Sequence, residues 1–142
     1  MAKKISITRF YPHTIDKVWF ALTNKHALAT WFTENDLPGN LDEMPIGFKF
    51  SFVSKPQGSW DGRMHCELLQ VSKQELLVYS FAGNWMKQPT TVTWKLSAED
   101  GGTTLTLEHT GFEGLRGYLL SFILKAGWKK SLSSNKFITA LG

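Results

Sequence analysis

Two segments that are predicted to be strands carry the side chains best suited to acid–base, thiol or metal chemistry. His109 ends the segment 103–110 and shares the alternation of Leu105 and Leu107, so its imidazole is expected to point inward. An inward histidine has two alternative roles, as a polar anchor for a ligand hydroxyl or as a hydrogen-bonded structural group. The sequence leaves both roles open, because it shows no assured partner for general acid–base catalysis.

The segment 60–71 holds three further candidates in a row. Glu67 is a second polar group that faces either a cavity or the outer surface, because the mixed alternation of this strand does not fix its register. His65 shares a face with Glu67, but no third ligand stands at a suitable spacing, so no metal site is predicted. Cys66, the only cysteine, is interpreted as a small buried side chain rather than a nucleophile.

No motif for covalent or cofactor chemistry accompanies these residues. The chain lacks the G-x-S-x-G element of serine hydrolases. Gly111, Gly114 and Gly117 recur every three residues, which is not the pattern of a dinucleotide or phosphate loop and better suits a hinge into a final helix. We therefore predict no catalytic residue, no metal and no cofactor.

Aromatic side chains are unusually frequent, with six tryptophans and ten phenylalanines in 142 residues. Several alternate along predicted strands and so share one face of a sheet, as Tyr79 and Phe81 do. Such a face either packs a solid core or lines an apolar cavity, whose aromatic walls would stack against a planar ligand. The function depends on which of the two is present.

Hydrophobic periodicity predicts the scaffold that positions these residues. A strand over 4–11 is followed by a helix with one apolar face and by a second short helix, and residues 33–47 are rich in turns. The apolar face of the first helix comprises Ile15, Val18, Trp19 and Leu22. Further strands are predicted near 47–54, 60–71, 75–82, 90–98 and 103–110, and short links between them indicate an antiparallel meander.

A single long helix is predicted over residues 115–140. Its main apolar face comprises Leu120, Leu124, Gly127, Trp128, Leu132 and Ile138. Leu119, Phe122 and Ala126 lie away from that face, so the part from 115 to 128 is apolar nearly all round. Three explanations stay open. The first is ordinary packing, either under loop 33–47 or in a dimer contact; the second is a gate for a hydrophobic ligand; the third is transient membrane contact.

The order of elements predicts an α+β fold. A curved antiparallel sheet of about six strands wraps around the long C-terminal helix, with two short helices after the first strand. A curved sheet of this kind leaves its interior partly open, so the cleft between sheet and helix is the natural place for a ligand.

Composition limits the class of protein. At 142 residues the chain is expected to be one domain, 1–142. Its net charge is +4, and its basic residues are spread along the chain without a basic stripe, so nucleic-acid binding is not expected. One cysteine excludes an internal disulfide, and the N-terminal residues lack the apolar run of a signal peptide, so we expect a cytoplasmic protein without stable membrane insertion.

Motifs spread over nearly the whole chain resemble those of a known group of proteins. The segment from Ile15 to Leu22 followed by Trp31-Phe32 is similar to the opening helices of the START-like, or helix-grip, superfamily (SRPBCC). Residues 76–81, 91–94, 101–112 and 127–128 resemble more narrowly the homologues of the C-terminal domain of the heat-shock-protein-90 ATPase activator. The resemblance implies a helix-grip fold, but the superfamily includes lipid carriers, hormone binders, polyketide cyclases and co-chaperones, and fold alone does not select among them.

We therefore expect a non-catalytic protein that binds a small hydrophobic, aromatic or lipid-like molecule between the sheet and the C-terminal helix. One alternative is a stress-response module that contacts a chaperone or forms a homodimer, and another is a cyclase or lyase that uses His109 with Glu67. The expected ligand-binding residues are Trp31, Phe48, Phe50, Tyr79, Phe81, Trp85, Trp94, His109 and Phe122.

Overall fold

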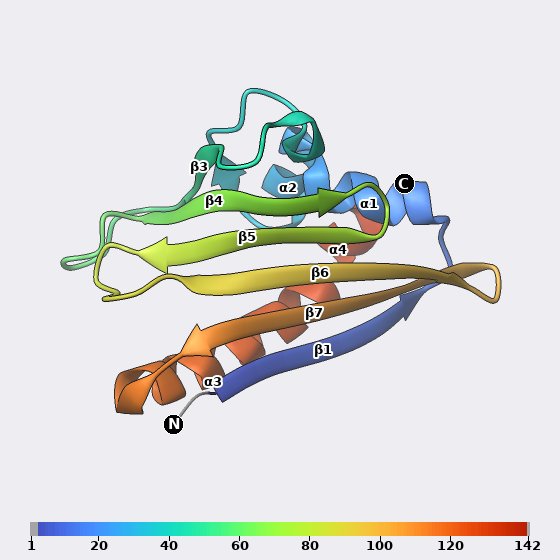
Figure 1. The fold of residues 1–142 in the computed structure, drawn as a ribbon. Coiled ribbons are helices and arrows are strands. Elements are labelled where there is room, and N and C mark those ends of the chain that lie inside the picture. The colour runs from blue at the N-terminus through green and yellow to red at the C-terminus, as the bar shows by residue number, and fades with distance from the viewer. Residues whose placement is uncertain (1–2, 142) are drawn as a thin grey trace.

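Seven antiparallel strands form one curved sheet in the computed structural model, which describes residues 3–141 (Figure 1). The strands are β1 (Lys3–Tyr11), β2 (Glu34–Asn35), β3 (Lys49–Val53), β4 (Arg63–Ser72), β5 (Leu76–Gly83), β6 (Thr90–Glu99) and β7 (Gly102–Phe112). Their order across the sheet is β1-β7-β6-β5-β4-β3-β2, so the last strand of the meander pairs with the first strand of the chain.

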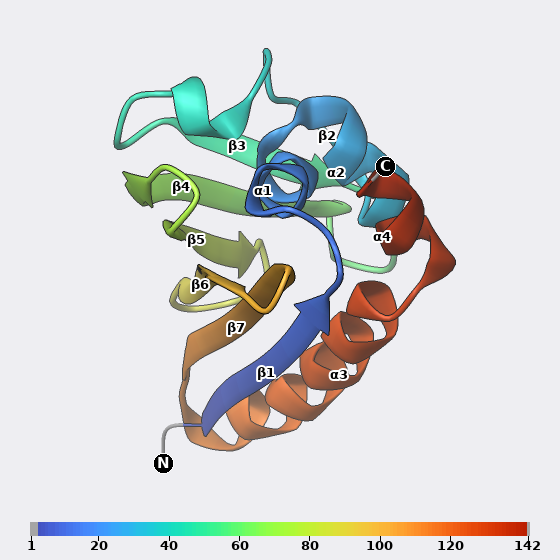
Figure 2. The same cartoon turned by 90° about the vertical axis from the view of Figure 1, so that its right-hand side faces the viewer.

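The helices lie on one side of this sheet (Figure 2). They are α1 (Ile15–Thr23), α2 (Lys25–Trp31), α3 (Gly114–Leu132) and α4 (Asn135–Ala140), and a 3-10 turn, η1, spans Leu41–Glu43. The predicted α+β helix-grip fold is thus confirmed, with seven strands rather than about six because the two-residue β2 joins the edge. None of the helices within residues 3–141 combines the length and apolar character that crossing a bilayer requires.

A β-bulge in β4 explains why the sequence did not fix the register of segment 60–71. Cys66 and Leu68 are buried and face the helices, but the pairing with β5 shifts between Leu68 and Gln70. The extra residue, Leu69, is 40% exposed, and beyond it Val71 packs against the core. Two inward residues of even number are therefore followed by one of odd number, which no single alternation describes.

The predicted single helix over 115–140 is wrong in one respect, because it is two helices. α3 ends at Leu132, and Ser134 caps α4 by accepting a hydrogen bond from the backbone N–H of Phe137 at 3.1 Å. The restart changes the helical register, so Phe137 is fully buried while the predicted Ile138 is 43% exposed. Polar Asn135 is the first residue of α4 rather than an interior position of a longer helix.

Backbone geometry accounts for two of the glycines that lead into α3. Gly111 and Gly114 have φ of +97° and +71°, a region that side chains with a Cβ rarely occupy. These two residues turn the chain from the end of β7 into α3, which then packs against β1 and β7. The predicted hinge position is thus a sharp, glycine-dependent turn.

A cluster of aromatic rings fills most of the space between sheet and helices. Trp94 of β6 contacts Trp31 and Trp128 edge to face, at centroid distances of 6.2 and 5.5 Å. Trp31 also packs on Phe137 at 4.9 Å, so α2, α3 and α4 meet the sheet through one set of rings. These rings fill much of the interior between the sheet and the helices of the described chain.

Candidate functional site

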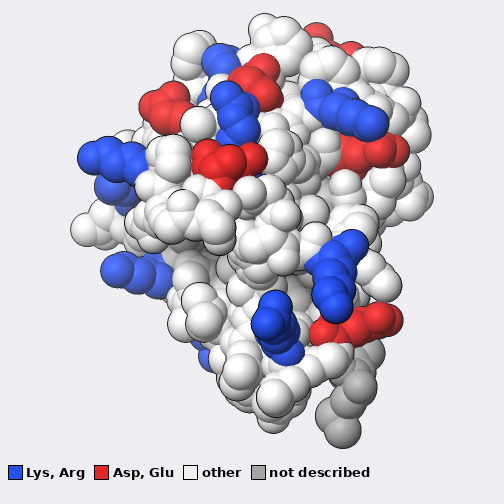
Figure 3. All heavy atoms as spheres, turned by 90° about the vertical axis from the view of Figure 1, so that its left-hand side faces the viewer, with Lys and Arg blue, Asp and Glu red and all other residues white. Residues whose placement is uncertain are grey.

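An apolar pocket of about 490 Å³ opens between the sheet and α3, at the end where β5 stops and α3 begins. This end is on the left in Figure 1. Twelve residues line the pocket: Phe32, Thr33, Phe52, Ser54, Gln57, Trp60, Met64, Phe81, Trp85, Leu120, Ile123 and Leu124. Figure 3 looks onto this end of the molecule, and charged side chains surround a central area that has none.

Strand alternation brings the aromatic walls of the pocket together. Phe52 of β3 and Phe81 of β5 both point toward the helices, with centroids 6.3 Å apart. Phe32, which follows α2, packs edge to face on Phe52 at 4.8 Å and stacks on Trp128 at 5.1 Å. Phe32 therefore separates the pocket from the filled core behind it.

The polar groups at the pocket are neutral, and two of them hydrogen-bond with each other. The Thr33 hydroxyl donates to the carbonyl of Val53 at 2.8 Å, and its oxygen lies 3.2 Å from the Ser54 hydroxyl. Since the Thr33 proton is already engaged, Ser54 donates in that pair and keeps its own oxygen available as an acceptor. The described lining residues include no acid, base, cysteine or histidine, so acid–base catalysis has no group there.

Trp85 folds back over the end of β5 and forms part of the pocket mouth. Its indole packs against Gly83, where an added Cβ would lie 2.7 Å from the indole nitrogen. A turn fixes this geometry, because the N–H of Met86 donates to the carbonyl of Gly83 at 3.0 Å. Half of Trp85 is still exposed, at 47%, so it covers the mouth without sealing it.

His109 lies in a fully buried chain of hydrogen bonds beside the core. The indole N–H of Trp128 donates to His109 Nδ1 at 3.1 Å. His109 Nε2 lies 2.7 Å from the hydroxyl of Thr90, which lies 2.6 Å from the carbonyl of Phe81. An indole N–H only donates, so Nδ1 is the acceptor, Nε2 carries the proton toward Thr90, and Thr90 donates to Phe81.

This arrangement keeps His109 neutral. Burial lowers the pKa of its imidazole from 6.5 to about 3, because the charged form would lose its hydration there. Both ring nitrogens are already hydrogen-bonded, so neither is available to a ligand unless one of these hydrogen bonds breaks. The sequence prediction that His109 points inward is confirmed, and its contacts are those of a structural histidine.

The nine expected ligand-binding residues fall into three groups. Phe81 and Trp85 line the pocket. Phe122 lies on the outer side of α3, 49% exposed, and Phe48 is half-buried against the core. The other five are buried in the filled core and do not line the pocket: Trp31, Phe50, Tyr79, Trp94 and His109.

The structure does not bring His109 and Glu67 together. Glu67 alternates with buried Cys66 and Leu68 and pairs with exposed Lys49, so its carboxylate is on the outer face of the sheet. His65 also points outward, where it contacts Asp61 at 3.1 Å. Burial raises the pKa of the Cys66 thiol, which fits an unreactive packing role.

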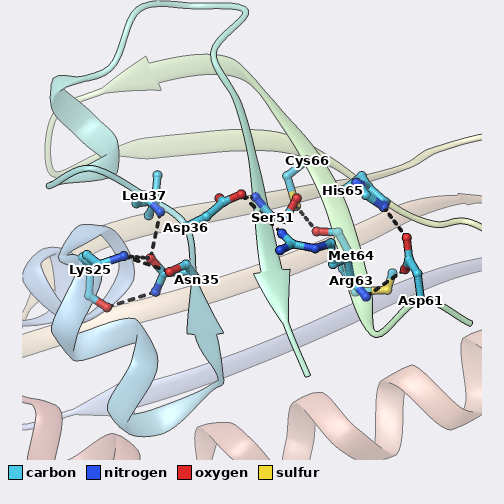
Figure 4. Close-up of polar contacts among 10 residues, drawn as sticks. All are labelled: Lys25, Asn35, Asp36, Leu37, Ser51, Asp61, Arg63, Met64, His65 and Cys66. Atoms are coloured by element: carbon cyan, nitrogen blue, oxygen red, sulfur yellow. Dashed lines mark hydrogen bonds and ion pairs between the residues drawn. The ribbon is translucent and has the colours of Figure 1, made fainter. Parts of the chain in front are cut away.

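Loop 33–47 packs beside α1 and α2 and contributes only Thr33 to the pocket. Polar contacts fix it there: Lys25 donates to the carbonyl of Asn35 at 2.8 Å, and Asp36 accepts from the backbone N–H of Ser51 at 2.6 Å (Figure 4). Near its other end, Trp19 donates to Asp42 at 2.8 Å. The outward residues of α3 are therefore not covered by this loop.

Some pocket residues were missed as site residues, although their inward direction was detectable. Phe52 continues the alternation of Phe48 and Phe50, and Leu120 and Leu124 were placed on the main face of the last helix. Phe32 and Met64 gave no such signal, because their place at the pocket depends on how α2 and the bulged β4 meet α3.

Comparisons with known proteins agree on the fold. The family model of the Activator of Hsp90 ATPase homolog 1-like protein matches residues 12–137. Protein MLL2253 from Mesorhizobium loti is 25% identical, with a TM-score of 0.73 over 98% of this chain and 93% of its own.

Two further structures are similar in fold. CalU16 from Micromonospora echinospora is 24% identical, with a TM-score of 0.75 over 99% of this chain and 77% of its own. The Aha1 dimer from Colwellia psychrerythraea is 18% identical, with a TM-score of 0.74 over 94% and 93%. Among curated proteins none matches. Since the family model covers most of the sequence, this chain belongs to the family of Activator of Hsp90 ATPase homolog 1-like proteins.

Proposed function

We propose that this protein binds a small hydrophobic molecule in the pocket between the sheet and α3. The observation that carries the proposal is a half-open pocket of about 490 Å³ with mostly aromatic and aliphatic walls and without an ionisable lining residue. That volume lies in the range of small-molecule sites, whose walls are mostly apolar with a few placed polar groups.

Burial of apolar surface would supply the affinity. Each 100 Å² of ligand surface removed from water contributes about 2.5 kcal/mol before the cost of ordering ligand and mouth. The rings of Phe32, Phe52 and Phe81 offer edges and faces to a planar ligand. We therefore favour a flat, mostly apolar molecule.

The polar groups near the mouth would orient one end of that ligand. Ser54 keeps an acceptor oxygen, Gln57 has an amide, and Trp85 has an indole N–H at the open end. A ligand with a single hydroxyl or carbonyl at one end would match this distribution. His109, which the sequence suggested for this role, is occupied by Trp128 and Thr90.

Binding is favoured over turnover because no two titratable groups converge on the pocket. A cyclase or lyase mechanism on His109 and Glu67 would need side chains that lie on opposite faces of the sheet. The proposal retains a cytoplasmic location, which fits the free, buried thiol of Cys66. A chaperone-contacting role is the alternative, and it would leave the pocket without an occupant.

Titration with the uncharged fluorescent probe N-phenyl-1-naphthylamine tests the proposal. Leu124→Trp enlarges a half-buried pocket residue and is expected to weaken probe binding about tenfold or more, because the indole overlaps the probe. The matched control is Leu119→Trp, the same change on the outer side of the same helix, where Leu119 is 54% exposed. The control should bind the probe like the unchanged protein.

Equal probe affinities in Leu124→Trp and Leu119→Trp would overturn the pocket assignment. Methyl chemical shifts of the unchanged protein give a second test that needs no variant. Probe addition should move the signals of Leu120, Ile123 and Leu124, and leave Leu115 in place. Shifts confined to Leu115 and Leu119 would place the probe on the helix surface and contradict the proposal.

A further inference from the structure

The outer face of α3 is apolar over its first three turns. We define this face by five exposed residues: Leu115, Leu119, Phe122, Ile123 and Ala126. They recur at spacings of three and four, so they form one continuous strip along the helix. Leu115 and Ile123 are 75% and 69% exposed, the largest values among the exposed large hydrophobic residues of the described chain.

Basic residues continue the same strip. Lys130 follows Ile123 and Ala126 at helical spacing, Lys129 follows Phe122, and Arg116 lies beside Leu119. The helix is thus apolar toward its start and basic in its last turn, with a further cation near the start.

The positive charge of the protein is concentrated in this region. Residues 114–142 contain five basic residues and no acidic one, whereas residues 1–113 contain 11 basic and 12 acidic residues. The five are Arg116, Lys125, Lys129, Lys130 and Lys136. The net charge of +4 therefore comes from the same part of the chain that exposes the apolar strip.

We propose that the outer face of α3 docks on an anionic lipid surface. Exposed apolar side chains would enter the boundary between headgroups and acyl chains, and the cations would contact anionic headgroups. Long lysine side chains reach headgroups while their apolar stems lie along the interface. A helix of 19 residues gives a contact about 28 Å long, from a rise of about 1.5 Å per residue.

Charge favours a lipid surface over a second copy of this chain. Two copies that met through this face would bring together two helices that each carry four cations and no acid. Like charges repel across such a contact, whereas an anionic membrane would compensate the cations of the outer face.

The pocket mouth borders this face. Ile123 belongs both to the outer face of α3 and to the pocket lining, and half-exposed Trp85 lies at the same mouth. A membrane-docked α3 would therefore set the mouth at the lipid boundary, where hydrophobic molecules partition. Docking itself does not depend on the proposed ligand function, so the two can fail separately.

Co-sedimentation with phosphatidylcholine vesicles, with and without phosphatidylserine, tests the docking proposal. The protein should bind the phosphatidylserine vesicles, bind pure phosphatidylcholine about tenfold or more weakly, and dissociate as salt is raised. Lys129→Glu with Lys130→Glu should lower binding about tenfold or more. The control pair, Lys17→Glu with Lys73→Glu, changes the net charge equally on exposed sites elsewhere and should retain binding.

The apolar contribution needs a separate pair of variants. Leu115→Ser with Leu119→Ser should also lower vesicle binding, whereas Ile46→Ser with Leu69→Ser, at other exposed sites, should not. Neither pair contains a pocket residue, so probe binding should be unchanged. Equal binding to both vesicle types would overturn the proposal, and so would equal losses of binding in the test and control pairs. It would also be overturned if the protein did not bind vesicles but self-associated, and if Leu115→Ser with Leu119→Ser abolished that self-association.

Discussion

Acidification is expected to destabilise this protein through His109. Burial lowers the pKa of the folded imidazole from 6.5 to about 3, so the unfolded chain takes up a proton first as the pH falls. The stability that the neutral ring contributes is therefore complete above about pH 6.5 and is lost between there and about pH 3. Within that window the loss is about 1.4 kcal/mol per pH unit.

Between about pH 7 and about pH 5 this group alone should cost about 2 kcal/mol of unfolding free energy. His109 is fully buried, so solvent screening does not reduce the figure. Urea denaturation at a series of pH values measures it. The slope of stability against pH should be smaller in His109→Gln than in the unchanged protein, while His26→Gln, at an exposed site, should keep the original slope.

An identical pH dependence in His109→Gln and the unchanged protein would refute this reasoning. Carboxylates also titrate at the lower end of the pH range. The effect of His109 is therefore measured by the difference in slope between the variant and the unchanged protein, and not by either curve alone. Should His109→Gln not fold, the ring proton signals of His109 in the unchanged protein decide the matter. They should stay constant down to about pH 5, since the folded imidazole remains neutral there.

Two further changes test neighbouring parts of the structure. Thr90→Val keeps the shape but removes the hydroxyl between His109 and the Phe81 carbonyl, so it should lower the unfolding free energy by about 1–3 kcal/mol in urea denaturation. Thr90→Ser keeps the hydroxyl and should lower it clearly less. Equal losses of stability in the two variants would contradict the chain of hydrogen bonds. Gly83→Ala places a Cβ 2.7 Å from the indole nitrogen of Trp85 and should displace that ring, changing N-phenyl-1-naphthylamine affinity; an unchanged affinity would show that Trp85 does not shape the mouth.

Local patterns were sufficient to predict most of the fold. The inward direction of His109 followed from the alternation of Leu105 and Leu107, and all three residues are buried. The first helix and the meander of strands also followed from periodicity and turn residues, because each spacing reports on a single element. The outward direction of Phe122 on the last helix was found in the same way.

Features that depend on several elements at once were not predictable. Nothing in the alternation of segment 60–71 marks Leu69 as the extra residue of a bulge, because the partner strand defines the register. The pocket arises where Phe32 and Leu120, from distant segments, fail to fill the space next to Phe81. Sequence periodicity identifies the buried face, but not where packing on that face stays incomplete.

The hydrogen bond between Trp128 and His109 limits how deep a ligand can reach. Phe32 and Phe81, the inner walls of the pocket, pack directly on Trp128, at 5.1 and 6.1 Å. A molecule too long for the existing space would have to displace that indole. Two buried polar atoms, Trp128 Nε1 and His109 Nδ1, would then lose their hydrogen bond, at a cost of about 1–3 kcal/mol each. Longer ligands should therefore extend outward past Trp85 instead, with their far ends left in contact with whatever surface the mouth faces.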